Sequence, residues 1–249
     1  MNDEKLLRYS RQIMLSDMDI AGQQKLIDAT VLIVGMGGLG CPVGMYLAAA
    51  GVGHLILADD DTVEITNLQR QIAHSQADIG SSKVESVAET LKALNREVHI
   101  TAMNQRLEEK DLDIQVASVD VVVDASDNFT TRFAINRACS KAKTPLVSGA
   151  AIRMEGMVAV FDPRDVESPC YQCLYKGGAD ESASCSENGV MAPIVGIIGS
   201  VQAMETIKVI TSIGKSLTGR LLLLDGKNMQ WREMTLPRDE NCLVCSLRN

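Results

Sequence analysis

The sequence has few aromatic residues and few histidines. Phe, Trp and Tyr together make up 3% of its 249 residues, while 46% of the residues are hydrophobic. The core is therefore predicted to be aliphatic. The 3 histidines, His54, His74 and His99, are scattered along the chain, and we expect each to be a surface or strand-edge residue.

A block of basic residues is also absent. The formal net charge is −8, and Lys and Arg are dispersed along the chain. This balance argues against a general nucleic-acid surface or an acidic-membrane surface. A phosphate-binding site in this chain must therefore be assembled from a few individual Lys and Arg side chains.

The sequence shows neither a signal peptide nor an uninterrupted membrane-spanning run. Its longest apolar stretch, Ala192 to Ile213, contains Gln202, Glu205 and Lys208. We therefore expect a soluble, cytoplasmic protein without a membrane partner. In that compartment the 7 cysteines are expected to be thiols or metal ligands rather than disulfides.

A glycine-rich turn is the strongest local signal. The apolar run 31–34 predicts a buried parallel strand, and 41–50 predicts a helix. Between them Gly35, Gly37 and Gly40 have the G-x-G-x-x-G spacing, which allows a tight turn, a close approach to phosphate and close helix–strand packing. The helix N-terminus adds unpaired N–H groups and a positive dipole. This arrangement predicts nucleotide binding.

Alternating strand and helix patterns predict a Rossmann-like, doubly wound α/β fold. Five such alternations occupy the first part of the chain, ending in a strand at 145–148. Beyond Gly149, the strand 152–161 and the hairpin 221–234 predict that the mostly parallel sheet is continued by antiparallel strands. Pro193 begins a long buried helix with Ile194, Ile197, Ile198, Val201, Met204 and Ile207 on its apolar positions. We expect one domain, 1–249, with N-terminal helices in 1–28, a nucleotide-binding core in 29–150 and a further region in 151–249.

Two C-x-x-C pairs predict a metal site. Cys170 with Cys173 and Cys242 with Cys245 supply four thiolates, enough for a closed tetrahedral zinc site that ties the C-terminal region to the middle of the chain. The alternative is a thioredoxin-like redox pair, but neither pair lies between a strand and a helix as that motif requires. Cys41 and Cys139 are predicted to be buried.

Several polar residues could together bind a nucleoside triphosphate. Asp59 and Asp127 follow predicted strands at their carboxyl ends, where open α/β sheets bind ligands. Lys83 begins a helix and Arg70 lies with Asn67 in the long loop after Asp59. The cations can neutralise phosphate charge, and a carboxylate such as Asp127 suits magnesium. Each residue alone could equally be a solvated surface group.

These motifs together resemble the MoeB and ThiF family, the bacterial relatives of the ubiquitin-activating enzymes. The resemblance extends from residue 8 to residue 245. It rests on the two C-x-x-C pairs and on these segments: Gly35-Met-Gly-Gly-Leu-Gly40, Asp59-Asp-Asp-Thr-Val, Asn67-Leu-Gln-Arg-Gln71, Lys83-Val-Glu-Ser, and Ser126-Asp-Asn128 with Arg132 and Asn136. Such a resemblance implies ATP-dependent adenylation of the C-terminal glycine of a ubiquitin-like sulfur-carrier protein ending in Gly-Gly.

The resemblance also implies roles for individual residues. It implies catalytic roles for Arg11, Arg70, Lys83, Asp127 and Cys185, a magnesium ion on Asp127 and zinc on Cys170, Cys173, Cys242 and Cys245. Arg11 would reach into the neighbouring subunit's site, which implies a homodimer. Nucleotide contacts are implied for Gly35, Gly37, Gly38, Gly40, Asp59, Asp61, Thr66, Asn67, Leu68, Gln69, Arg70, Lys83, Asp127 and Asn128.

Several alternatives stay open at this point. Segment 148–156 and Met191-Ala-Pro resemble MoeB, whereas 8–12, 22–26, 224–227 and Gln230-Trp231 resemble ThiF, so the carrier could serve molybdopterin or thiamine thiazole synthesis or both. Cys185 could take up the activated carrier or be a spare surface thiol, and the sulfur would come from a separate donor protein. The same glycine motif would also suit an NAD-dependent oxidoreductase or a non-enzymatic scaffold.

Overall fold

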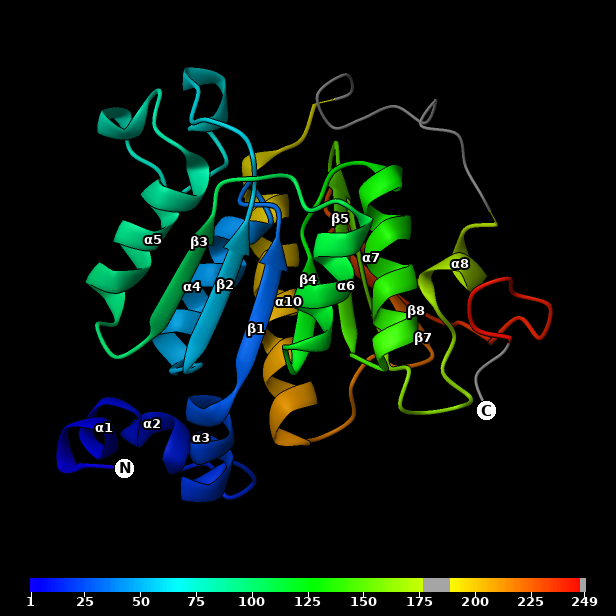
Figure 1. The fold of residues 1–249 in the computed structure, drawn as a ribbon, viewed down its shortest axis with the longest axis horizontal. Helices are drawn as coiled ribbons and strands as arrows, with labels where there is room; N and C mark the ends of the chain where they lie inside the picture. Colours follow the sequence, from blue (N-terminus) through cyan, green and yellow to red (C-terminus); the bar gives the residue numbers. More distant parts are fainter. Residues whose placement is uncertain (177–188, 247–249) are drawn as a thin grey trace.

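The computed structural model describes residues 1–176 and 189–246, and in this part of the chain the strands form one eight-stranded sheet (Figure 1). The strand order is β3-β2-β1-β4-β5-β6-β7-β8. The first five strands are parallel and the last three are antiparallel, which confirms the predicted sheet. Their bounds are β1 Thr30–Val34, β2 His54–Ala58, β3 His99–Met103, β4 Val121–Asp124, β5 Leu146–Ile152, β6 Glu155–Phe161, β7 Arg220–Asp225 and β8 Gln230–Thr235.

Helices precede, connect and cover the strands. The α-helices are α1 Asp3–Arg8, α2 Ser10–Ile13, α3 Asp19–Asp28, α4 Gly40–Ala50, α5 Lys83–Leu94, α6 Glu109–Ala117, α7 Phe129–Ala142, α8 Tyr171–Leu174 and α10 Ala192–Thr211. Two short 3₁₀ helices, η1 Ile65–Asn67 and η2 Gln76–Asp78, lie in the connection between β2 and α5.

Alternate residues of the central strands pack into two separate apolar clusters. Val31 and Ile33 of β1 join side chains of α3, α4, α5 and α10 on one face of the sheet. Leu32 and Val34 join those of α6, α7 and α8 on the other face. Because both faces are covered, the central strands are almost wholly aliphatic, as parallel strands usually are.

The strand order reverses beside β1, and this reversal forms the site. β1 lies between β2 and β4, and Val34 is in register with both Ala58 and Asp124. Gly35, Asp59 and Ala125 therefore leave the sheet at the same level. Ligands of open α/β sheets bind at such a switch point, outside the carboxyl ends of the strands.

The helix α10 differs from its expectation in two respects. It is long and apolar enough to qualify as a membrane-spanning helix, contrary to the prediction from the sequence. However, 56% of its most apolar 18-residue stretch is buried within the protein. Met204, predicted to be buried, is exposed, while Gln202 and Glu205 are buried. Gln202 donates from Nε2 to the Asp124 carbonyl oxygen at 2.8 Å, although its buried Oε1 has no partner among the described residues. Glu205 accepts from the Leu217 amide at 2.7 Å, so a specific hydrogen bond helps to compensate for the burial of each side chain.

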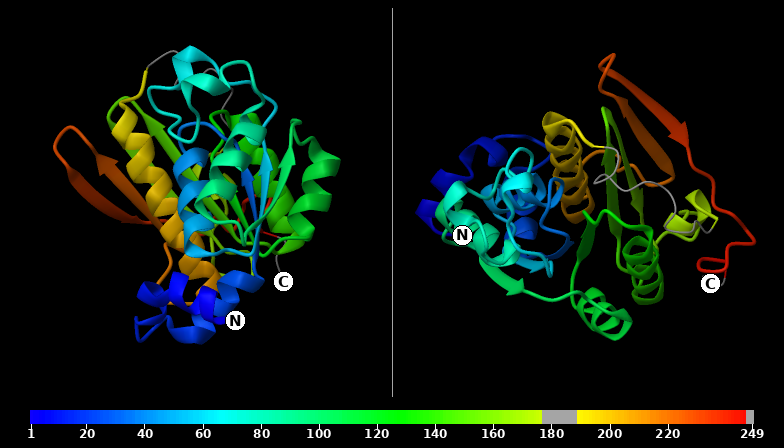
Figure 2. Two further views of the ribbon diagram at one scale, coloured as in Figure 1. Left: turned by 90° about the vertical axis from the view of Figure 1, so that its left-hand side faces the viewer. Right: turned by 90° about the horizontal axis from the view of Figure 1, so that it is seen from above.

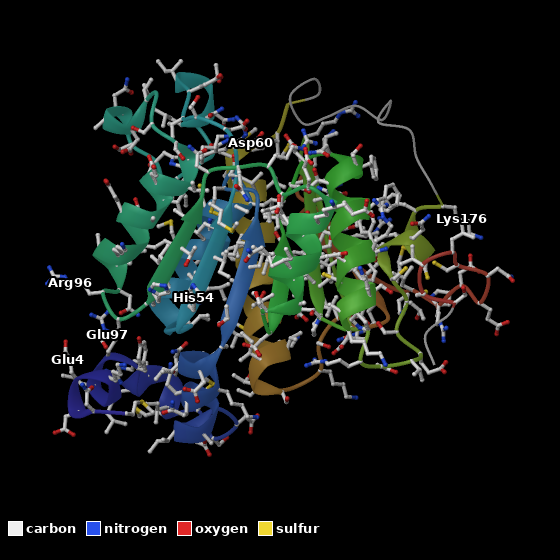
Figure 3. The ribbon with its side chains drawn as sticks, in the orientation of Figure 1. Glu4, His54, Asp60, Arg96, Glu97 and Lys176 are labelled. Carbon is white, nitrogen blue, oxygen red and sulfur yellow. The ribbon has the colours of Figure 1, made fainter. Side chains whose placement is uncertain are left out.

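The N-terminal helices and the hairpin of β7 and β8 occupy the periphery. Figure 2 shows this hairpin, in orange and red, extending from the body of the molecule. Every residue of β8 is exposed. In Figure 3 Asp60 lies at the carboxyl ends of the parallel strands, whereas Glu4 of α1 lies at the opposite end of the molecule.

Candidate functional site

A polar cavity of about 460 Å³ lies at the carboxyl ends of β1, β2, β3 and β4. It brings together most of the nucleotide contacts expected from the sequence, namely Gly35, Gly37, Gly38, Asp59, Asp61, Asn67, Arg70, Lys83, Asp127 and Asn128. Four expected contacts, Gly40, Thr66, Leu68 and Gln69, do not line the cavity. The cavity is thus formed by segments far apart in the chain, from Val34 to Val195.

In the glycine loop between β1 and α4, two positions have no room for a side chain. Gly35 has φ of 96°, and a Cβ there would lie 2.7 Å from the Ala125 carbonyl oxygen. A Cβ on Gly40 would lie 1.9 Å from the Gly35 carbonyl oxygen. Gly40 therefore shapes the loop without lining the cavity. In the described structure the amides of Gly37, Gly38 and Leu39 donate to no protein acceptor, so they are available to an anion.

Asp59 ties the end of β2 to this loop. Its Oδ2 accepts from the Met36 amide at 2.6 Å, and its Oδ1 accepts from the Asp61 amide at 2.9 Å. Burial raises the pKa of Asp59, although these two hydrogen bonds and the charge of Lys83 oppose the rise. Each oxygen keeps lone pairs for a ligand hydroxyl.

Two cations approach the cavity from the connection between β2 and α5. Lys83, at the start of α5, is buried, and its Nζ lies 2.7 Å from Asp61 Oδ2. Arg70 is held by a hydrogen bond from Nη1 to the Thr66 carbonyl oxygen at 3.1 Å. Thr66 therefore orients Arg70 without lining the cavity itself. The Asn67 side chain accepts from the Glu64 amide at 3.0 Å and so stabilises the η1 turn.

The segment after β4 contributes an exposed carboxylate, which accepts from Asn128 Nδ2 at 3.4 Å, and a buried arginine. Asp127 is exposed and lines the cavity. Asn128 caps α7 by accepting from the Thr131 amide at 2.9 Å, so it fixes the segment that carries Asp127. Arg132 donates from Nη2 to the Ser126 carbonyl oxygen at 2.6 Å. Burial opposes the charge of Arg132, but the nearby Asp124 and Tyr171 raise its pKa, so it stays a cation.

Arg106, Arg132 and Gln71 are among the cavity side chains that were not expected as site residues. Arg106 follows β3, so the rule that selected Asp59 and Asp127 would also have found it. Arg132 and Gln71 belonged to the motifs that carried the resemblance, but received no role there. Gln71 is 3% exposed, and its Oε1 has no hydrogen-bond partner in the structure. Gln71 itself lines the cavity, where its Nε2 would lie 3.5 Å from a Cβ built on Gly37.

The four C-x-x-C cysteines form a second site, remote in sequence from the cavity. Their Sγ atoms all lie within 4.8 Å of one another. Cys170 Sγ lies 3.5 Å from that of Cys242, and Cys173 Sγ lies 3.4 Å from that of Cys245. A tetrahedral zinc with 2.3 Å bonds requires sulfur atoms about 3.8 Å apart, so the four thiols fit such an ion.

Hydrogen bonds around the cysteines favour a thiolate at Cys173. Asn136 of α7 donates to Cys170 Sγ at 3.7 Å, and the Asp239 amide donates to Cys173 Sγ at 3.4 Å. The Cys170 thiol and the backbone donors of Cys170 and Asp239 lower the pKa of Cys173 to about 4. The contact with Cys173 raises the pKa of Cys170, and burial raises that of Cys245. Outer donors of this kind orient metal ligands. Cys41 and Cys139, by contrast, are buried in the apolar clusters, as predicted.

Among the described residues, one expected catalytic residue, Arg11, does not line the cavity. Arg11 is exposed on α2 and makes no ion pair or side-chain hydrogen bond within the described residues. The N-terminal helices lie at the end of the molecule opposite the cavity of their own chain (Figures 1 and 3). Cys185 lies outside the described residues.

Comparisons with known proteins agree over the whole chain. Residues 9–244 match the ThiF family. The chain is 48% identical to the molybdopterin-synthase adenylyltransferase of Escherichia coli K12 over 245 residues, 98% of each chain. It is 45% identical to the sulfur carrier protein ThiS adenylyltransferase of the same bacterium, covering 100% of this chain and 98% of that one. The adenylyltransferase and sulfurtransferase MOCS3 of Anopheles gambiae is 44% identical, and the match spans 56% of its length.

Solved structures with the same fold include those of E. coli MccB. The crystal structure of E. coli MccB with AMPCPP and MccA has a TM-score of 0.85 and 25% sequence identity, and the match covers 98% of this chain and 76% of that one. The same enzyme has also been solved with ATP. With its glycine loop, its polar cavity and a family match from residue 9 to residue 244, the chain belongs to the ThiF family.

Proposed function

We propose that this protein adenylates the C-terminal glycine of a ubiquitin-like sulfur-carrier protein with ATP. The observation that carries the proposal is the convergence of unpaired loop amides with Arg70, Lys83 and Asp127 on one cavity. The full-length relatives named for adenylation of molybdopterin synthase and of ThiS support the carrier as the substrate.

The reaction needs orientation and charge compensation rather than a protein nucleophile. A carrier carboxylate oxygen bonds to the α-phosphorus, and the bond from that phosphorus to the oxygen leading to the β-phosphate breaks. Its electron pair leaves with pyrophosphate. Arg70, Lys83 and the loop amides would bind the phosphates and stabilise this charge. Asp127 would hold a magnesium ion, which supplies further charge compensation when bound.

Asp59 and Gln71 would orient the nucleoside. Asp59 already accepts two backbone hydrogen bonds and keeps acceptor capacity for a ribose hydroxyl. Asp61 would hold Lys83 in position between reactions, because their ion pair at 2.7 Å joins the loop to the first turn of α5.

The proposal includes a homodimer in which Arg11 completes the partner's cavity. Arg11 cannot serve its own chain from the opposite end of the molecule. Leu7 and Met14, close to Arg11 in the sequence, are exposed apolar residues, and so are Tyr46 and Met204. Tyr46 and Met204 also line a groove of about 380 Å³ between α2, α4 and α10. An exposed apolar surface of this kind is typical of a subunit interface.

Zinc at the four cysteines would be structural, because four protein ligands leave no open position. Cys185 and a separate sulfur-donor protein would act only after adenylation. The relatives named for molybdopterin synthase and for ThiS have nearly equal identity to this chain, so the proposal extends to both kinds of carrier. We expect the enzyme to act in the cytoplasm, where ATP and such carriers occur.

The direct test is exchange of labelled pyrophosphate into ATP by the purified protein. Exchange should require magnesium and a carrier ending in Gly-Gly, and a carrier lacking its last glycine is the matched control. Molybdopterin-synthase-type and ThiS-type carriers should be compared side by side. Exchange that does not depend on the carrier would contradict the proposal. Binding of NAD without binding of ATP would also contradict it and would favour the oxidoreductase alternative.

A further inference from the structure

His74 lies behind the glycine loop rather than at the surface, contrary to the sequence expectation. It is 8% exposed and lies between α5 and the loop. Its Nδ1 lies 2.8 Å from Ser86 Oγ, and its Nε2 lies 3.3 Å from the Met36 carbonyl oxygen. Met36 is the second residue of the G-x-G-x-x-G segment, and its side chain is fully buried.

The contacts determine the protonation of the ring. A carbonyl oxygen only accepts hydrogen bonds, so Nε2 must carry a hydrogen. Burial lowers the pKa of His74, and so does the charge of Lys83, while Asp78, Asp59 and the Met36 contact oppose the shift. In the neutral ring Nδ1 then accepts from the Ser86 hydroxyl, which fixes the Nε2–H tautomer.

The Met36 residue is held from both sides. Its amide donates to Asp59 Oδ2 at 2.6 Å, and its carbonyl oxygen accepts from His74 and, at 3.5 Å, from the Cys41 thiol. Burial raises the pKa of Cys41 to about 12, so this thiol stays neutral and is a weak donor. His74 is therefore the stronger donor to this oxygen.

Holding this oxygen determines which way the next amide points. In a trans peptide the carbonyl oxygen and the following N–H point in opposite directions, and the described chain has no cis peptide. With the Met36 oxygen turned toward His74, the Gly37 N–H is turned to the opposite side, and Gly37 lines the cavity. Rotation of this peptide changes Met36 ψ and Gly37 φ, and because a glycine adopts positive φ readily, backbone strain alone would not prevent the rotation. A rotated peptide would present a carbonyl dipole to the phosphates and repel them.

We infer that His74 is a positioning residue, which keeps the Gly37 amide directed at the nucleotide phosphates through its neutral Nε2–H. This inference rests on the proposed function only in taking ATP as the ligand. It involves no contact between His74 and ATP.

Two substitutions separate the hydrogen bond from the packing. His74→Gln keeps an N–H near the position of Nε2, whereas His74→Asn keeps only a group near the position of Nδ1 and cannot reach Met36. Equilibrium binding of Mg-ATP, without any carrier, should be at least about tenfold weaker in His74→Asn and within about threefold of wild type in His74→Gln. His54→Asn, at the other end of the sheet, is the matched control and should bind as wild type (Figure 3).

Each outcome bears on the inference. Unchanged binding by a folded His74→Asn protein would overturn it, and so would equal losses in both variants. A wild-type protein that binds no ATP would contradict the proposed function instead. Should the variants not fold, nitrogen NMR of wild-type His74 at neutral pH decides, because a hydrogen on Nδ1 alone would overturn the inference and a hydrogen on Nε2 alone is expected.

Discussion

At the scale of single residues, the cavity brings Arg70 and Lys83 together with the exposed carboxylate of Asp127. Asp127→Ala removes the proposed magnesium ligand, and Arg70→Ala removes charge compensation for the phosphates. Each should lower carrier-dependent pyrophosphate exchange at least about a hundredfold. Arg96→Ala, which removes an exposed cation at the other end of the sheet, is the control and should leave exchange unchanged (Figure 3). Near-normal exchange in Asp127→Ala or Arg70→Ala would remove that residue from the mechanism.

The sequence predicts residues whose position follows from strand ends. Asp59, Asp127 and the glycines were found because the carboxyl ends of parallel strands gather at one edge. His74 was missed because nothing in a single sequence shows that its neighbours in space are Met36 and Ser86. The buried polar positions of α10 were missed for the same reason, since their hydrogen-bond partners come from β4 and the segment before β7. Hydrogen bonds between residues that are far apart in the chain leave no local pattern in the sequence.

At the scale of elements, α10 supplies a test of packing on one helix. A Cβ on Gly196 meets no atom within 4 Å, whereas a Cβ on Gly199 would lie 2.5 Å from Pro42 Cγ and 2.7 Å from the Leu39 carbonyl oxygen. Gly196→Ala should therefore raise the free energy of unfolding by about 0.5–1 kcal/mol, the helix-propensity gain. Gly199→Ala should lower it by about 2 kcal/mol. Chemical denaturation measures both, and equal effects would show that α4 and α10 pack differently.

The C-terminal segment is the element that depends on the cysteines. The Asp239 amide donates to Cys173 Sγ at 3.4 Å, and Arg238 donates from Nη1 to the Val166 carbonyl oxygen at 2.7 Å, so the chain after β8 is tied to the middle of the chain at and beside this cluster. We expect one zinc ion per chain by metal analysis, and its removal should increase hydrogen exchange of residues 236–246 before it affects the parallel sheet. Cys139→Ala should keep its zinc, whereas Cys173→Ser should lose most of it. Less than half an equivalent in the wild-type protein would contradict the site.

At the scale of the whole molecule, the fold separates Arg11 from the cavity of its own chain, so the proposed dimer makes a quantitative prediction. Arg11→Ala and Asp127→Ala proteins should each be nearly inactive. When equal amounts are unfolded and refolded together, about half of the dimers should contain one copy of each variant. In such a dimer the Arg11→Ala subunit keeps Asp127 and receives Arg11 from its partner, so one of the two sites is intact. The mixture should therefore recover about a quarter of the wild-type exchange rate. Refolded wild-type protein is the reference. Recovery no greater than the average of the two separate variants would show that Arg11 acts within its own chain or not at all.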